Sequence, residues 1–171
     1  MIILILGSGG REHALSWKIS KSSLCNKIYI APGNGGTDKI GTNIDIDINN
    51  FHEVKSFILD KKIDLVIVGP EDPLVNGIVD FINNDKDLNE IKIFGPSKKG
   101  AQLEGSKNFS KDFMFRNNIP CGASKTFSQE TFDNGVDFIK SLSAPYVLKA
   151  DGLAAGKGVL IIDNKDEAIK E

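Results

Sequence analysis

The stretch Lys149-Ala-Asp-Gly-Leu-Ala-Ala-Gly-Lys-Gly158 is a glycine-rich loop with an apolar run on each side, at residues 146–148 and 159–162. Both runs are short and are rich in β-branched or aromatic residues, which predicts two strands. Glycine tolerates positive φ and lets backbone N–H groups approach an anion without a side chain in the way. Because a lysine lies near each end of the loop, the hairpin favours a polyphosphate ligand such as ATP. The residues that carry this prediction are Lys149, Gly152, Gly156, Lys157 and Gly158.

The neighbouring alternative is a Walker A loop, in which four residues separate a glycine from a Gly-Lys-Ser/Thr sequence at the start of a helix. Here three residues separate Gly152 from Gly156, Gly158 follows Lys157, and the next segment has the pattern of a strand. This spacing excludes a Walker A loop. A plain glycine-rich hairpin with two solvated lysines remains open at this point.

The composition is that of an ordinary globular protein. Of the 171 residues 40% are hydrophobic and 26% are charged. A net charge of −2 and a pI of about 5.7 argue against nucleic acid or a membrane surface as a partner. Residues 1–6 lack the basic start of a signal peptide, and Cys25 and Cys121 lack the spacing of a metal site. These features predict a cytoplasmic location and are compatible with a monomer.

The first half of the chain alternates between strand and helix patterns. An apolar strand at residues 2–6, a glycine turn at 7–10 and a helix at 11–20 open it. This is the start of a doubly wound α/β fold, in which ligands bind at the carboxyl ends of the strands. The pattern predicts a parallel, Rossmann-like sheet over about the first 95 residues. Its further strands are expected at 27–31, 42–48, 64–68 and 91–94, and its further helices at 51–59 and 74–82.

The first glycine turn does not have the pattern of a dinucleotide site. That fingerprint needs a third glycine where this chain has Glu12, whose carboxylate would repel a pyrophosphate. The second strand ends in Pro32-Gly-Asn-Gly-Gly-Thr37 rather than in an acidic residue that could hold a ribose. We therefore expect Gly7–Gly10 either to present N–H groups to a small anion or only to allow a tight turn.

Two adjacent carboxylates follow the strand at 64–68. Glu71 and Asp72 lie at its carboxyl end, close to the first glycine turn, in a loop that two prolines stiffen. Asp72 has the better position for a helix cap. For Glu71 a helix cap is the less favoured role. Together with Glu12 it could instead form a pair of carboxylates that accepts hydrogen bonds from a polyhydroxyl or amine ligand. No Ser–His–Asp or Cys–His arrangement is evident, so the sequence does not predict a nucleophilic side chain.

The pattern changes after residue 96. Helices are predicted at 98–103, 106–116 and 132–142, with a short strand at 125–127 before the glycine-rich hairpin. A further helix begins near residue 166. The hairpin and its helices therefore form a second region, separate from the parallel sheet.

Six segments follow one another in the order of a known family. They are ILGSGGREHAL (5–15), APGN (31–34), VGPEDPLV (68–75), FGP (94–96), AQLEGSK (101–107) and KADGLAAGKGV (149–159). Together they resemble the glycinamide ribonucleotide synthetase family of purine biosynthesis, phosphoribosylamine–glycine ligases of the ATP-grasp type. The resemblance implies a Rossmann-like substrate domain at 1–103 and the start of an incomplete ATP-grasp domain at 104–171.

The resemblance also implies a reaction and roles for residues. ATP would phosphorylate glycine, and the amine of phosphoribosylamine would displace the phosphate to give the amide. By analogy Lys107 and Lys149 would contact ATP phosphates, and the loop from Asp151 to Gly158 would close over them. The residues expected to face phosphoribosylamine are Gly9, Gly10, Arg11, Glu12, Glu71 and Asp72. The ligands of Mg²⁺ or Mn²⁺ would lie beyond Glu171, so we expect this segment alone to be inactive.

Two alternatives stay open. Another ATP-grasp carboxylate–amine ligase would have the same layout but different substrates. A non-catalytic nucleotide-binding module would need only the loops.

Overall fold

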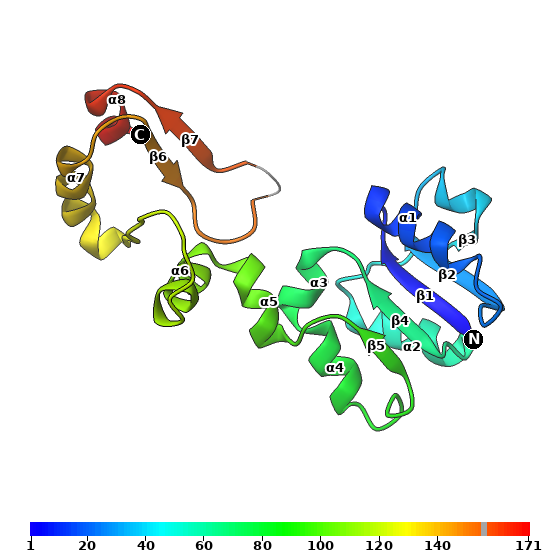
Figure 1. The fold of residues 1–171 in the computed structure, drawn as a ribbon. Helices are drawn as coiled ribbons and strands as arrows, with labels where there is room; N and C mark the ends of the chain where they lie inside the picture. Colours follow the sequence, from blue (N-terminus) through cyan, green and yellow to red (C-terminus); the bar gives the residue numbers. More distant parts are fainter. Residues whose placement is uncertain (155–156) are drawn as a thin grey trace. The chain divides into compact units, whose positions relative to one another are not determined.

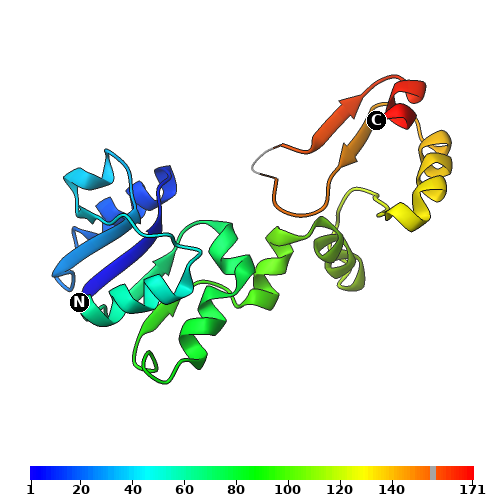
Figure 2. The same ribbon diagram turned by 180° about the vertical axis from the view of Figure 1, so that it is seen from behind.

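The computed structural model describes residues 1–154 and 157–171. The described chain divides into two compact units, Met1–Gln102 and Leu103–Glu171. Figures 1 and 2 show the elements of both units from opposite sides. The helix α5 (Lys98–Gly105) contains the boundary.

The first unit is built around a parallel sheet in the order β3-β2-β1-β4-β5. The central strand β1 pairs in parallel with β2 on one side and with β4 on the other. This is the order of a Rossmann-like fold, in which the chain reverses direction across the sheet next to β1. The strands are β1 (Ile2–Gly7), β2 (Lys27–Pro32), β3 (Thr42–Asn43), β4 (Leu65–Val68) and β5 (Lys92–Phe94).

The sheet is buried on both faces because alternate residues of each strand point to opposite sides. Leu4 and Leu6 of β1 join the larger core, while Ile3 and Ile5 join a smaller one on the other face. Helix α2 covers the larger core with Val54 and other apolar residues. The helices of this unit are α1 (Gly10–Ile19), α2 (Phe51–Lys61), α3 (Glu71–Asn76) and α4 (Ile78–Asn84), with a 3₁₀ turn at Thr37–Lys39.

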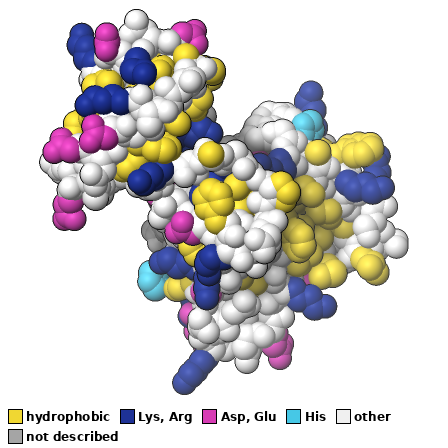
Figure 3. Space-filling model, turned by 60° about the vertical axis from the view of Figure 1, so that its left-hand side comes forward, with side chains coloured by type: hydrophobic (Ala, Val, Ile, Leu, Met, Phe, Trp, Pro, Cys, Tyr) yellow, Lys and Arg dark blue, Asp and Glu magenta, His cyan; other side chains and the backbone are white. Residues whose placement is uncertain are grey.

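The second unit contains the predicted hairpin as an antiparallel pair, β6 (Tyr146–Lys149) and β7 (Val159–Ile162). Its core consists of Tyr146, Ile162 and Ala168, with Ile139 and Leu148 packed against them. Val147, Val159, Leu160 and Ile161 of the two strands are exposed. Figure 3 shows hydrophobic side chains at the surface among charged ones. The helices are α6 (Lys107–Arg116), α7 (Phe132–Ser141) and α8 (Lys165–Lys170), with a 3₁₀ turn at Gln129–Thr131.

Two predicted strands are wrong in extent. The strand expected at 42–48 ends at Asn43, although Ile44, Ile46 and Ile48 still pack against the core. The N–H of Ile44 still donates to the carbonyl of Ile30 in β2 at 2.8 Å, but that of Ile46 donates to Ile44. Beyond Ile44 the alternation therefore reflects burial of apolar side chains and not a hydrogen-bonded ladder. The strand expected at 125–127 is irregular, and Phe127 packs on Phe138 of α7 with ring centroids 5.6 Å apart.

Two helix predictions also need correction. The helix expected at 74–82 is two helices, α3 and α4, because Gly77 between them has φ of 101° and ends the first. On α1 the spacing of Ala14, Leu15, Trp17 and Ile19 predicts one buried apolar stripe, but Ala14 and Trp17 are exposed. The buried positions of α1 are Glu12 and Ser16, and Leu15 and Ile19 pack on the smaller core.

Candidate functional site

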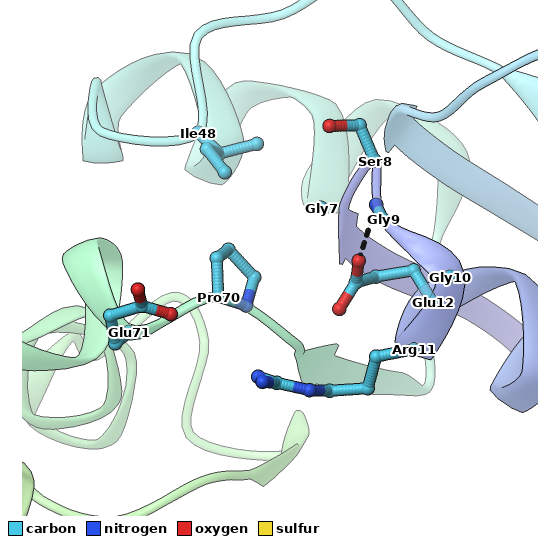
Figure 4. A pocket seen from close by; sticks show the side chains of 9 residues that line it. All are labelled: Gly7, Ser8, Gly9, Gly10, Arg11, Glu12, Ile48, Pro70 and Glu71. Carbon is cyan, nitrogen blue, oxygen red and sulfur yellow. Dashed lines mark hydrogen bonds between the residues drawn. The ribbon is translucent and has the colours of Figure 1, made fainter. Parts of the chain in front are cut away.

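A cavity of about 380 Å³ lies in the first unit, where β1 and β4 end side by side. This is the position at which open α/β sheets bind their ligands. The cavity brings together the glycine turn after β1 and the loop after β4, as Figure 4 shows. Its lining residues are Gly7, Ser8, Gly9, Gly10, Arg11, Glu12, Ile48, Pro70 and Glu71.

Glu12 is the most buried charged residue of this wall, with 4% of its surface exposed. Its Oε2 accepts a hydrogen bond of 2.6 Å from the N–H of Gly9, directly before α1. Its side chain also packs against Gly7 and Gly69, where an added Cβ would overlap the carboxylate stem. The carboxylate therefore occupies the anion position that the N-terminus of a helix creates. Glu12 acts as an internal anion in the place where a dinucleotide fold would hold pyrophosphate.

Arg11 and Glu71 supply the accessible charges of the cavity. The guanidinium of Arg11 donates a hydrogen bond to the carbonyl of Gly69, and Figure 4 shows its side chain extending past Pro70. Glu71 is the half-buried first residue of α3. Figure 4 shows Glu12 and Glu71 on either side of Pro70, so the structure brings both predicted carboxylates to one cavity.

The other predicted residue of this loop, Asp72, does not line the cavity as described and is exposed. Its predicted role as a helix cap is wrong, because Pro70 occupies the N-cap position of α3 and no side-chain cap bond occurs there in the described structure. Asp72 lies in the first turn of α3, where a carboxylate is favourable through the helix dipole alone.

Asn34, which sequence reasoning did not single out, fastens the loop after β2 to the first glycine turn. Its Nδ2 donates to the carbonyl of Ser8 at 2.8 Å, and its Oδ1 accepts from the N–H groups of Gly36 and Thr37 at 2.7 and 3.1 Å. Thr37 is fully buried and also donates to Asn43 at 2.8 Å. These bonds hold the wall of the cavity in place. The only sequence signal for this role was the Ala31-Pro-Gly-Asn34 segment.

In the second unit the glycine-rich loop joins β6 to β7. Gly152 and Gly158 have φ of 92° and 73°, a region in which other residues are strained. The N–H of Ala150 donates to the carbonyl of Gly158 at 2.9 Å and closes the base of the loop. Gly156, a predicted residue of the ATP site, lies outside the described residues.

Lys149 and Lys157 are both exposed. Lys149 ends β6 opposite Val159. The apolar run before Lys149 predicts a buried strand, at whose end a lysine would be poorly solvated, but Lys149 is exposed and reaches solvent without such a cost. Lys107 is the first residue of α6, and its Nζ donates to the carbonyl of Gly152 at 2.9 Å. The loop and the start of α6 are therefore in direct contact.

Asp151 lies at this contact and binds the N-terminus of α6. Its Oδ1 accepts from the N–H of Lys107 at 2.6 Å and of Asn108 at 3.3 Å, and its Oδ2 accepts from the hydroxyl of Ser106 at 3.1 Å. Partial burial raises the pKa of the Asp151 carboxyl, but hydrogen bonds from Gly152, Lys107, Asn108 and Ser106 outweigh it and lower the pKa from its usual value. Sequence reasoning missed Ser106 and Asn108, whose partner lies more than forty positions away.

Residues 1–154 and 157–171 contain neither a candidate metal site nor a candidate membrane-spanning helix. These residues contain no cluster of three His, Cys, Asp or Glu side chains that could hold a metal ion. None of the described helices is long and apolar enough to cross a membrane.

A Rossmann-like sheet followed by helices and a lysine-bearing, glycine-rich antiparallel hairpin defines the ATP-grasp class, of which this chain contains part. The family comparison is more specific. Residues 1–104 match the family described as phosphoribosylglycinamide synthetase, N domain, and residues 105–171 match its ATP-grasp (A) domain. The chain belongs to the phosphoribosylglycinamide synthetase family.

Similar proteins agree with this assignment. Phosphoribosylamine–glycine ligase from Mesorhizobium japonicum is 49% identical over 98% of this chain and 38% of its own length. The same enzyme from Clostridium acetobutylicum is 46% identical over 99% of this chain and 40% of its own length. The crystal structure of phosphoribosylamine–glycine ligase from Thermotoga maritima is 34% identical with a TM-score of 0.71, covering 99% of this chain and 38% of that one. The chain thus spans about two fifths of the length of these relatives.

Proposed function

We propose that the protein containing this chain is an ATP-dependent ligase that joins glycine to phosphoribosylamine. The products would be glycinamide ribonucleotide, ADP and phosphate. The observation that carries the proposal is the family match, which runs through both units without a break. The two loops expected to bind the substrates fall within that match. One follows β1 and the other follows β6.

The first unit would bind phosphoribosylamine in the cavity at the ends of β1 and β4. The N–H group of Gly10 and the guanidinium of Arg11 offer donors on one side, beside Gly9, whose own N–H is held by Glu12. Glu12 and Glu71 offer acceptors for ribose hydroxyls and for the amine, and Asp72 adds negative charge at the rim. One oxygen of Glu12 is already engaged by Gly9, which leaves the other for the ligand.

The second unit would bind the phosphates of ATP. Lys107, Lys149 and Lys157 would offset their charge, and the loop from Asp151 to Gly158, Gly152 and Gly156 included, would cover them. A carboxylate oxygen of glycine attacks the γ-phosphorus and releases ADP, giving glycyl phosphate. The amine nitrogen then attacks the carbonyl carbon, phosphate leaves, and the amine loses a proton. Catalysis in this scheme comes from positioning and charge stabilisation, without a protein nucleophile.

The family chemistry implies Mg²⁺ or Mn²⁺ as well as ATP. The described residues contain no group of three His, Cys, Asp or Glu side chains that could hold the ion, so the proposal names no metal ligand among them. We further propose a cytoplasmic monomer whose partners are small molecules and which has no nucleic-acid or membrane partner. Size-exclusion chromatography of the full-length protein checks the monomer.

The test is a coupled ADP-release assay on the full-length protein with ATP, glycine and phosphoribosylamine. We expect ADP release that requires all three, with glycinamide ribonucleotide formed in equal amount. ADP release with a different carboxylate or amine, but not with these two, would favour another ATP-grasp ligase. Nucleotide binding without ADP release under any of these conditions would favour a non-catalytic module.

A further inference from the structure

We propose that Asp151 is a positioning residue, which ties the glycine-rich loop to the N-terminus of α6 and thereby sets Lys107 in place relative to Lys149. It does so without contacting the nucleotide itself. The structural part of this inference stands on hydrogen bonds within the second unit. Its consequence for ATP rests on the proposed function.

The tie is made in both directions. From the loop, the Asp151 carboxylate accepts hydrogen bonds from the N–H groups of Lys107 and Asn108 and from the hydroxyl of Ser106. From the helix, the Nζ of Lys107 donates to the carbonyl of Gly152 at 2.9 Å. The two segments are 44 residues apart in sequence at the contact between Lys107 and Asp151, so the tie is a tertiary contact and not a local turn.

The start of α6 explains why a carboxylate is used. The first N–H groups of a helix have no partner within the helix, and together they favour negative charge. Ser106, the N-cap residue, accepts from the N–H of Phe109 at 3.1 Å. Asp151 takes the N–H groups of the two residues in between. Side chains from two distant segments thus complete the first turn of one helix.

The same contacts argue against a direct role for Asp151 at the phosphates. Its carboxylate already has partners in two amides and a hydroxyl at the helix end. A carboxylate facing polyphosphate would repel it, whereas one turned toward a helix N-terminus is stabilised there. The chain therefore uses the negative charge internally and leaves the lysines to meet the ligand.

The position of the tie connects the two lysines. Lys149 ends β6 only two residues before Asp151, and Lys107 begins the helix that Asp151 holds. The bond between Ala150 and Gly158 fixes the base of the loop. With both fastenings in place, the spacing of Lys107 and Lys149 is set before ATP arrives, and less ordering remains to oppose binding.

The experiment compares two substitutions in the full-length ligase. Asp151→Ala removes the tie, so we expect the KM for ATP to rise about tenfold. Asp151→Asn keeps an oxygen that caps a helix nearly as well as aspartate does, so we expect it to stay within about threefold of wild type. Asp163→Ala, which removes an exposed carboxylate after β7, is the matched control and should leave the KM for ATP unchanged. Thermal unfolding of each variant checks that it is folded.

A second measurement needs no ATP. Amide hydrogen exchange at Lys107 and Asn108 should accelerate at least tenfold in Asp151→Ala and much less in Asp151→Asn. If Asp151→Asn harms ATP use as much as Asp151→Ala does, the charge itself acts on the ligand and the positioning role is overturned. Unchanged exchange in Asp151→Ala overturns the tie. If wild-type protein fails to use ATP while the exchange results hold, only the proposed function fails.

Discussion

Replacing Glu12 tests whether a buried carboxylate holds the first glycine turn together. In Glu12→Ala the N–H of Gly9 loses a charged acceptor at 2.6 Å, which costs about 1.5–3 kcal/mol. The helix N-terminus loses its nearby charge, worth about 0.3–1 kcal/mol. The Cγ methylene packed on Gly7 and Gly69 is also lost, at about 0.8 kcal/mol when well buried. Allowing for partial relaxation, we expect a loss of about 3 kcal/mol.

For a domain of the size of the first unit, Met1–Gln102, such a loss lowers the melting temperature by about 12–24 °C. Thermal and urea unfolding of the 171-residue chain measure it. The matched control is Asp72→Ala, which removes an exposed carboxylate from the first turn of α3 and should cost less than about 0.5 kcal/mol. Glu12→Gln keeps the shape and loses the charge, so it should fall between the two. Equal unfolding of Glu12→Ala and Asp72→Ala would refute the role of Glu12 as an internal anion.

Four further outcomes are expected. In the full-length protein Lys149→Ala should lower kcat/KM for ATP at least tenfold, about 1.4 kcal/mol, with little change in stability because Lys149 is exposed; unchanged kinetics would remove it from the site. Glu71→Gln should weaken phosphoribosylamine use and leave the KM for ATP alone, whereas a loss of stability without a kinetic change would contradict the proposal. The hydrogen bond from Lys55 lowers the pKa of Asp85 in the folded protein from its usual value of 3.8. The stabilisation by the Lys55–Asp85 pair is therefore complete at a pH above 3.8, and it is lost as the pH falls through the lower pKa of the folded state. Acid unfolding of wild type and Asp85→Asn should therefore converge only at strongly acidic pH. The 171-residue segment alone should release no ADP and bind ATP no tighter than roughly millimolar, which calorimetry would disprove by finding micromolar affinity.

The sequence predicted what depends on local pattern. Fully apolar runs at the positions of β1 and β4 gave the centre of the parallel sheet, and the glycine-rich stretch gave the hairpin of β6 and β7. The alternation of isoleucine and aspartate at 44–48 was misleading, because the same period arises whenever alternate side chains are buried, with or without a neighbouring strand. Gly77 shows the converse: one residue with positive φ ends a helix that the apolar pattern would continue.

Site prediction from sequence had a different limit. Glu12 and Glu71 were correctly expected near each other, because the topology of a parallel sheet brings the ends of adjacent strands to one edge. The contacts of Asn34 with Ser8, and of Asp151 with α6, follow no spacing rule. Each depends on how two segments meet after folding. A polar residue beside a glycine turn therefore gave no sign of whether it would bind a ligand or hold the turn.

Glu12 and Asp151 both hold a turn in shape, each in a different unit. Each is a carboxylate beside a glycine-rich loop. At the start of a helix, Glu12 accepts a hydrogen bond from one N–H group and Asp151 accepts from two. Those N–H groups would otherwise be the natural place for a phosphate. Because the chain fills both places with its own negative charge, the loops are held in shape before any ligand binds. A phosphorylated ligand must then be met by cationic side chains and by the remaining amides, which is why the proposed sites include Arg11 and the three lysines and not the helix ends alone.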